Sequence, residues 1–210
     1  MRSIFVATTN RGKLAELRAM LDPVGWQLEL FADYIEPVEG EESYAANAAI
    51  KARALAAQLR AGGDRTAVIA DDSGLEVSAL DGRPGVRSAR YGGDASWGER
   101  RRLLLAELTA AASRDRSARF VCAIHFVDET GVQTQAIGEV RGRIAVGERG
   151  AAGFSYDAIF ELPERGLTFA ELDAREKNAL SHRAAACRQL LARLGGGHVA
   201  GRANQAGDGM

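Results

Sequence analysis

Cysteine is scarce in this chain, and its shortage excludes one large class of protein. The 210 residues include two cysteines, Cys122 and Cys187, which lie in apolar surroundings and form no CxxC pair. A disulfide framework or a thioredoxin-like redox motif would need more cysteines or a closer spacing. We therefore expect two buried, reduced thiols in a cytoplasmic protein.

Charge of one sign and long apolar runs are lacking as well. The formal net charge is -1, which gives no sequence-wide case for a nucleic-acid or membrane partner. No apolar run approaches bilayer-spanning length, and residues 3–7 resemble a strand rather than the start of a signal peptide. The hydrophobic fraction of 46% and the charged fraction of 26% instead indicate a globular domain.

The alternation and periodicity of apolar residues predict an α/β fold. Strands are predicted at residues 3–7, 26–31, 67–70, 75–79, 119–128 and 132–141, and helices after residue 13 and at 44–59, 96–112, 174–179 and 182–194. A turn at residues 128–131 predicts a long hairpin, which we expect to form a second lobe. Residues 195–210 are Gly-rich and aperiodic, so we predict one domain over 1–194 and a disordered tail.

Two adjacent acids, Asp71 and Asp72, follow the apolar run at residues 67–70 and precede Ser73 and Gly74. They are expected at the carboxyl end of a buried strand, where ligands of α/β sheets collect. Buried acids are retained where they are paired or hold a metal. Since adjacent strand residues face opposite sides, we expect one of the two to face a site. The alternative is a polar turn in which Gly74 supplies a positive φ.

A candidate phosphate loop, TTNRGK at residues 8–13, follows the first strand and precedes an amphipathic helix. Backbone N–H groups, the helix dipole and Lys13 favour an anion at such a place. The loop lacks the second glycine and the final Ser or Thr of a Walker A motif, and alone it is a weak signal. Farther on, Asn47 and Lys51 share one face near the start of the helix at 44–59.

The last helical stretch is predicted to break at Ser181. Asp173 and Glu176 form a capping pair for its first helix. In a single continuous helix, Lys177 and Ser181 share a face but His182 and Arg183 follow at steps of about 100°, so the four could not all converge on one base. An N-cap at Ser181 would start a second helix and let its neighbours turn inward.

Four segments, in this order and spacing, resemble the inosine/xanthosine triphosphate pyrophosphatase family. They are TTNRGK at 8–13, DDSGL at 71–75, FSYD at 154–157 and SHR at 181–183, with Lys177 upstream. The resemblance covers residues 2–194. It implies an elongated, mixed-sheet, two-lobed ITPase-like (Maf/Ham1) fold with the active site in the cleft between the lobes, usually in a homodimer. It also implies Mg²⁺-dependent hydrolysis of the purine nucleoside triphosphates ITP, dITP and XTP to the monophosphate and pyrophosphate.

The resemblance further implies a role for each matching residue. Asp72 matches the catalytic aspartate, and Glu39 and Asp72 match the Mg²⁺ ligands. The positions that match substrate-binding residues are Thr8, Thr9, Asn10, Arg11, Gly12, Lys13, Lys51, Ser73, Phe154, Ser155, Tyr156, Asp157, Lys177, Ser181, His182 and Arg183.

The donors expected around the base favour one kind of purine. Lys177 and Arg183 only donate hydrogen bonds, and His182 can donate from either ring nitrogen. A 6-keto oxygen accepts from such groups, whereas the 6-amino group of adenine leaves them without a partner.

Several departures from the family pattern leave two alternatives open. The family usually reads GGFG[YW]DP where this chain has Ala152, Ser155 and Ala158, and Ala46 replaces a glutamate before the helix asparagine. If Ser155 takes the positive φ of the family glycine, the backbone is strained there. The alternatives are a Maf-like nucleotide pyrophosphatase of other base preference and a nucleotide-binding module without turnover.

Overall fold

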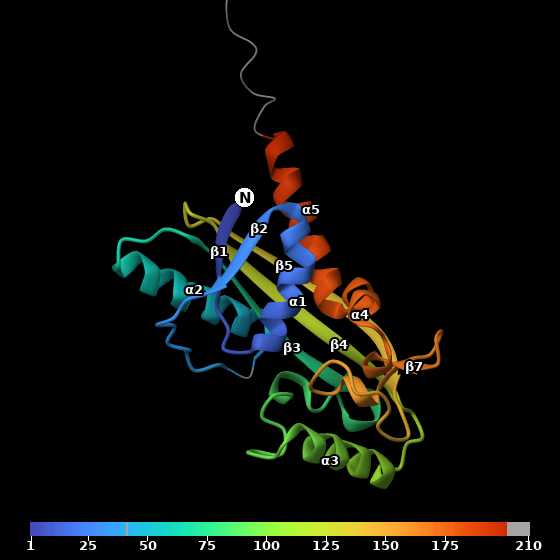
Figure 1. Cartoon of the computed structure of the whole chain (residues 1–210). Helices are drawn as coiled ribbons and strands as arrows, with labels where there is room; N and C mark the ends of the chain where they lie inside the picture. Colours follow the sequence, from blue (N-terminus) through green and yellow to red (C-terminus); the bar gives the residue numbers. More distant parts are fainter. Residues whose placement is uncertain (41, 201–210) are drawn as a thin grey trace, which may run out of the picture.

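One mixed sheet of seven strands runs through the molecule in the order β2-β1-β3-β4-β5-β6-β7 (Figure 1). The computed structural model describes residues 1–40 and 42–200, with side chains described as far as residue 195. The strands are β1 (Arg2–Val6), β2 (Trp26–Leu30), β3 (Ala67–Val77), β4 (Ser117–Val127), β5 (Gln133–Ile144), β6 (Phe160–Leu162) and β7 (Leu167–Thr168). Strand β1 is parallel to both β2 and β3, and every later pairing is antiparallel.

Five α-helices and five 3₁₀ turns accompany the strands over the described residues. The helices are α1 (Arg11–Leu21), α2 (Tyr44–Ala61), α3 (Trp97–Ala110), α4 (Ala174–Leu180) and α5 (His182–Ala200). The 3₁₀ turns are η1 (Asp22–Val24), η2 (Ser78–Leu80), η3 (Gly85–Arg87), η4 (Asp157–Ile159) and η5 (Phe169–Glu171). Of these elements, η5, α4 and α5 follow the last strand. The predicted cap of α4 is confirmed, because Asp173 accepts from the N–H of Glu176, and Ser96 and Glu99 form a capping box on α3.

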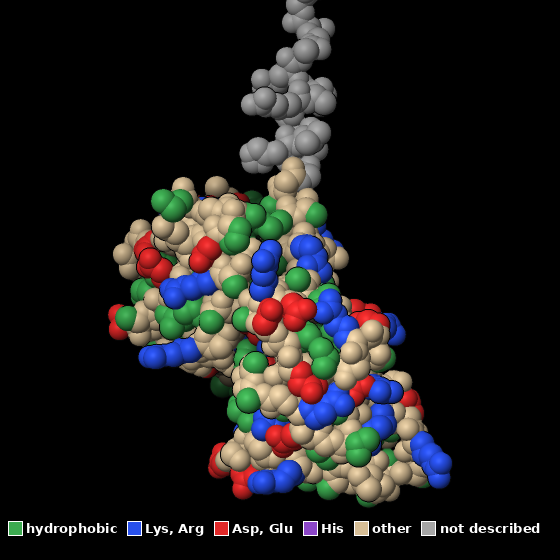
Figure 2. Space-filling model, turned by 45° about the vertical axis from the view of Figure 1, so that its right-hand side comes forward, with side chains coloured by type: hydrophobic (Ala, Val, Ile, Leu, Met, Phe, Trp, Pro, Cys, Tyr) green, Lys and Arg blue, Asp and Glu red, His purple; other side chains and the backbone are tan. Residues whose placement is uncertain are grey.

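Buried apolar side chains form four clusters among the described residues, and the two largest, called here the first and second core, lie at opposite ends of the sheet. Helices α1, α2 and α5 cover one end, and α3 lies at the other (Figure 1). The β4–β5 hairpin is confirmed, but the expectation that it forms the second lobe is wrong. Phe126 of β4 packs in the first core and Phe120 of the same strand packs in the second. The long strands therefore join the lobes, over which basic and acidic side chains are interspersed (Figure 2).

Strand β3 corrects the position expected for the central acids. The two short strands predicted around them form one strand, because β4 pairs along its whole length from Val68 to Val77. Asp71 and Asp72 consequently lie inside a central strand rather than at its end. Gly74 is extended as well, so it does not supply a positive φ. It is needed for close approach, since a Cβ there would lie 2.4 Å from the carbonyl oxygen of Gly85.

The end of the chain confirms one prediction and corrects another. The helical stretch breaks at Ser181, whose hydroxyl accepts from the N–H of Ala184. Helix α5 then extends to Ala200, so residues 195–200 are helical rather than part of a disordered tail. Once a helix is nucleated, adding residues needs little further stabilisation. The rest of the expected tail, 201–210, lies outside the described residues.

Two expectations from composition can also be compared with the fold. Cys122 and Cys187 are free and buried, as expected. Within the part of the chain that the structure describes, no helix has the length and apolar character needed to cross a membrane.

Candidate active site

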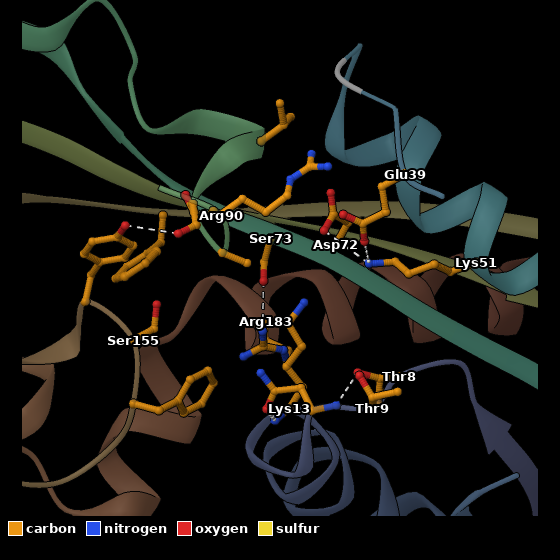
Figure 3. Close-up of a pocket in the computed structure, with 18 of the residues that line it drawn as sticks. Thr8, Thr9, Lys13, Glu39, Lys51, Asp72, Ser73, Arg90, Ser155 and Arg183 are labelled. Atoms are coloured by element: carbon orange, nitrogen blue, oxygen red, sulfur yellow. Dashed lines mark hydrogen bonds and ion pairs between the residues drawn. The ribbon is translucent and has the colours of Figure 1, made fainter. Parts of the chain in front are cut away.

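A pocket with a volume of about 560 Å³ lies where the two lobes meet. The structure brings fourteen of the eighteen predicted site residues to its wall. These are Thr8, Thr9, Asn10, Lys13, Glu39, Lys51, Asp72, Ser73, Phe154, Ser155, Tyr156, Lys177, His182 and Arg183. Figure 3 shows Glu39, Lys51 and Asp72 at one end and Ser155 at the other, with the Thr8–Lys13 loop facing β3 between them. Segments distant in sequence thus meet at one cavity, as the resemblance implied.

Four predicted residues do not line this pocket. Arg11 is exposed and lies beside a separate shallow hollow. Gly12 lies behind the wall, where an added Cβ would be 3.2 Å from the Phe154 ring. Asp157 is buried against the loop that carries Phe154, and Ser181 caps α5. Three of the four therefore shape the pocket without facing it.

Asp72 belongs to a small charged group at one end of the pocket. Its carboxylate accepts from Asn47 Nδ2 at 3.1 Å and from Lys51 Nζ at 3.2 Å. The same ammonium donates to Glu39 Oε1 at 2.8 Å. Burial raises the pKa of Asp72, and Lys51 only partly opposes that shift. Asp72 is consequently a stronger base than an ordinary aspartate.

Asp71 points to the other face of β3 and meets different partners. Lys13 Nζ lies 3.2 Å from its Oδ2, and Arg183 donates to the same oxygen from Nη2 at 3.0 Å. Burial acts to raise the pKa of Asp71, but Lys13 and Arg183 outweigh it and hold that pKa below its usual range. The prediction that one of the two acids faces the site is confirmed, and Asp72 is that residue.

Glu16 is a buried acid that the sequence reasoning missed. It accepts from Lys177 Nζ at 2.7 Å and from Arg183 Nη1. Asp157 completes the group, because its Oδ2 accepts from Lys177 Nζ at 2.5 Å and from the N–H of Phe154 at 2.7 Å. The available signal was that Glu16 interrupts the apolar stripe of α1 next to Leu17. Buried carboxylates on the side away from the pocket thus fix Lys177 and Arg183, the two cations expected to contact the base.

These ion pairs reduce the number of hydrogen-bond donors that Lys177 and Arg183 can offer to a purine base. Lys177 uses two of its three N–H donors on carboxylates, and Arg183 uses four of its five on Asp71, Glu16 and Ser73. Each retains one donor for a ligand. His182 stacks on Phe120 with 4.7 Å between ring centroids. Burial, and then the charges of Arg183 and Lys177, lower the pKa of His182 well below its ordinary value, which keeps the ring neutral.

Comparison with known proteins agrees with this arrangement. The model of the Ham1 family matches residues 4–193. The chain belongs to the Ham1 family. The dITP/XTP pyrophosphatase of Gloeobacter violaceus is 46% identical over 191 residues, covering 91% of this chain and 93% of that protein. The dITP/XTP pyrophosphatase of Exiguobacterium sibiricum is 42% identical over 195 residues, covering 91% and 96%.

The fold expected from the resemblance is confirmed by a solved structure. A HAM1 protein from Coxiella burnetii superposes with a TM-score of 0.81 at 39% sequence identity, covering 93% of this chain and all of that one. The two-lobed α/β architecture is therefore that of the Ham1 family.

One departure of this Ham1 chain from the family pattern has a visible structural effect. Ser155 has a φ of 59°, the left-handed conformation expected for the glycine it replaces. Its carbonyl oxygen accepts from Arg101 Nη1 of α3 at 2.8 Å, and Arg101 is itself paired with Glu148. The strained turn is thus held from outside the pocket.

Part of the pocket wall was not predicted. The additional lining residues are Glu36, Pro37, Val38, Gly74, Val86, Ser88, Ala89, Arg90, Trp97 and Phe120. The family resemblance assigned none of these residues a role. Trp97 packs edge-on against Tyr156 at 5.5 Å, which connects α3 to the wall.

Proposed function

We propose that this Ham1-family chain hydrolyses non-standard purine nucleoside triphosphates (ITP, dITP and XTP) to the monophosphate and pyrophosphate. The observation that carries the proposal is the Asp72–Lys51–Glu39 group, which shares one pocket with the Thr8–Lys13 loop and the Phe154 ring. Two relatives named dITP/XTP pyrophosphatase support the same activity, and they favour it over the Maf-like alternative.

The triphosphate would meet hydroxyls and cations rather than bare amides. Asn10 Oδ1 already accepts from the N–H groups of Gly12 and Lys13, at 2.9 and 3.1 Å. What remains for phosphate oxygens is the positive end of the α1 dipole, the ammonium of Lys13 and the hydroxyl of Thr8, whereas the Thr9 hydroxyl donates to Glu36 Oε2 at 3.1 Å. This favours positioning by charge, which is what phosphoryl transfer requires of a protein.

We propose Mg²⁺ as the cofactor, with Glu39 and Asp72 as its protein ligands. The fit rests on the donor set: two carboxylates converge on one ammonium, that of Lys51, and carry one more negative charge than it neutralises. No group of three or more His, Cys, Asp or Glu side chains suited to a metal occurs within the described residues. Mg²⁺ accepts such a sparse set, because it keeps several waters and takes phosphate oxygens as further ligands. When bound, it would neutralise charge on the phosphates.

Different residues of the chain would serve the separate steps of binding and hydrolysis. With its raised pKa, Asp72 can accept a proton from the water that attacks the α-phosphorus. Lys51 and Lys13 can neutralise the leaving pyrophosphate. Phe154 offers a ring face to the base, and Lys177 lies 4.7 Å from the centroid of that ring.

Base selectivity would come from the few donors that carboxylates leave available. The remaining donors of Lys177 and Arg183 suit a 6-keto oxygen, whereas adenine presents a donor at that position. We expect kcat/KM for ATP to be at least about 10²-fold lower than for ITP. Rejection of GTP follows from the family resemblance, since guanine also carries a 6-keto group.

The test is incubation of the chain with Mg²⁺ and ITP, dITP, XTP, GTP or ATP, with separation of all products. Monophosphate plus pyrophosphate from the first three, lost in excess chelator, is the expected result. Stepwise release of orthophosphate would contradict the reaction, and similar values for ITP and ATP would contradict the donor argument. Binding without turnover would favour the nucleotide-binding module. The homodimer and the cytoplasmic location stay predictions.

A further inference from the structure

The basic side chains that line the pocket differ in whether a carboxylate neutralises them. Five basic side chains line it, and four of them are ion-paired: Lys13 with Asp71, Lys51 with Glu39 and Asp72, Lys177 with Glu16 and Asp157, and Arg183 with Glu16 and Asp71. Arg90 is the fifth. Its side chain is exposed and makes no ion pair or hydrogen bond with any of the described residues. Arg90 therefore holds a positive charge that these carboxylates do not neutralise.

The loop that carries Arg90 is fixed rather than loose. Ser88 Oγ accepts from the N–H of Leu75, near the C-terminal end of β3, at 2.9 Å, and the Ser88 carbonyl oxygen accepts from Tyr156 Oη at 3.0 Å. On the other side, Arg100 of α3 donates to the carbonyl oxygens of Ala89 at 2.5 Å and Gly93 at 2.7 Å. The backbone is thus held on both sides of Arg90.

The direction of the side chain matches this placement. Figure 3 shows Arg90 rising from its loop beside Ser73 and extending along β3 toward the Asp72 end of the pocket. It lies across the pocket from Lys13 and the threonines of the α1 loop. A polyanion between the two walls would therefore meet cations on both sides.

We propose that Arg90 is a further catalytic residue, which binds the anionic oxygens of the triphosphate from the wall opposite the α1 loop. The inference rests on the proposed function and extends it. A planar guanidinium can bind two phosphate oxygens at once. Charge spreads over the phosphoryl oxygens in the transition state, so a cation already held in place stabilises it without rearrangement.

The experiment compares Arg90→Gln and Arg90→Lys with the wild type and with Arg102→Gln. Arg102 is an exposed arginine of α3 that does not line the pocket, so it serves as the matched control. The readouts are kcat/KM for ITP and XTP, the dissociation constant of inorganic tripolyphosphate by calorimetry, and the melting temperature.

For Arg90→Gln we expect kcat/KM to fall roughly 10²-fold for ITP and XTP alike. We expect tripolyphosphate to bind about tenfold more weakly and the melting temperature to be unchanged, because the side chain is exposed. Arg90→Lys should recover part of both losses, since the charge is kept without the planar fork. Arg102→Gln should match the wild type in every readout.

Two outcomes would overturn the inference. Wild-type kcat/KM and wild-type tripolyphosphate affinity in Arg90→Gln would show that Arg90 faces solvent throughout. A changed ratio of ITP to XTP with unchanged tripolyphosphate affinity would place Arg90 at the base instead. If the wild type hydrolysed no triphosphate, the proposed function would fail, and the tripolyphosphate titration would still decide whether Arg90 binds the anion.

Discussion

Asp71 and Asp72 are neighbours in sequence, yet they lie in opposite electrostatic surroundings. Asp71 faces Lys13 and Arg183, which hold its pKa low, whereas Asp72 faces the pocket with Lys51 and Asn47, and burial raises its pKa. The cause is the pleat of β3, which turns adjacent side chains to opposite faces of the sheet. Burial alone does not separate the two roles, since both acids are buried. The two roles are separated by the identity and number of the cations around each carboxylate.

The largest effect that would test this comparison is the loss of turnover in Asp72→Asn. We expect kcat to fall by roughly 10²-fold or more, because the substitution removes the base and one negative charge at the proposed cation site. The measurement is pyrophosphate release from ITP, with circular dichroism to show that the fold is kept. Near wild-type turnover would show that Asp72 is not the catalytic base.

Asp71→Asn should show the reverse pattern, with a smaller loss of activity and a larger loss of stability. Removing this carboxylate leaves Lys13 and Arg183 with less compensation in a buried environment, which costs about 3 kcal/mol of unfolding free energy. Urea unfolding of both asparagine variants gives the comparison. Equal destabilisation by the two substitutions would contradict the structural role assigned to Asp71.

Residues close together in the sequence predicted much of this site. The prediction failed for features that depend on pairing between distant segments of the fold. The caps at Ser96 and Asp173 and the break at Ser181 were predictable, because each is determined by residues within one turn. The course of β3 through its acids was not, since ladder bonds to β4 outweigh the low strand propensity of Asp and Gly.

The buried ion pairs are the second feature that could not be predicted from the sequence. The basic residues Lys177 and Arg183 were assigned to the pocket, but their attachment to Glu16, about 160 residues away in sequence, left no local pattern. Arg90 and Trp97 were similarly indistinguishable from surface and core residues until the fold placed them at one cavity. Proximity of this kind is set by the packing of helices on the sheet, which periodicity does not specify.

Ser155→Gly tests the opposite end of the pocket from Asp72, where the expected effect comes from backbone strain rather than from charge. Glycine adopts the φ of 59° without the steric cost that serine carries, so we expect a gain of about 1 kcal/mol in unfolding free energy. Ser78→Gly is the control, because Ser78 is exposed and does not have a positive φ. It should lose a few tenths of a kcal/mol to the greater chain entropy of glycine. A loss of stability in Ser155→Gly would show that the turn is not strained.

The last comparison concerns His182, which the same network keeps neutral, whereas it keeps Asp71 charged. Burial lowers its pKa first, then Arg183 and Lys177, with a smaller contribution from Lys13, and Asp71 only partly opposes them. Because the folded pKa is lowered, the unfolded chain takes up a proton that the folded chain refuses once the pH falls below about 6.5.

The stability that His182 contributes is therefore complete above about pH 6.5 and decreases as the pH falls toward the folded pKa. We expect the unfolding free energy to drop between pH 7 and 5, by at most about 1.4 kcal/mol per pH unit from this one group, and His182→Gln to flatten that slope. A smaller slope should persist, because burial also lowers the pKa of His125. His125→Gln is the matched control, and adding it to His182→Gln should reduce the slope further. An unchanged slope in His182→Gln would mean that the ring becomes protonated in the folded protein, which the two cations beside it oppose.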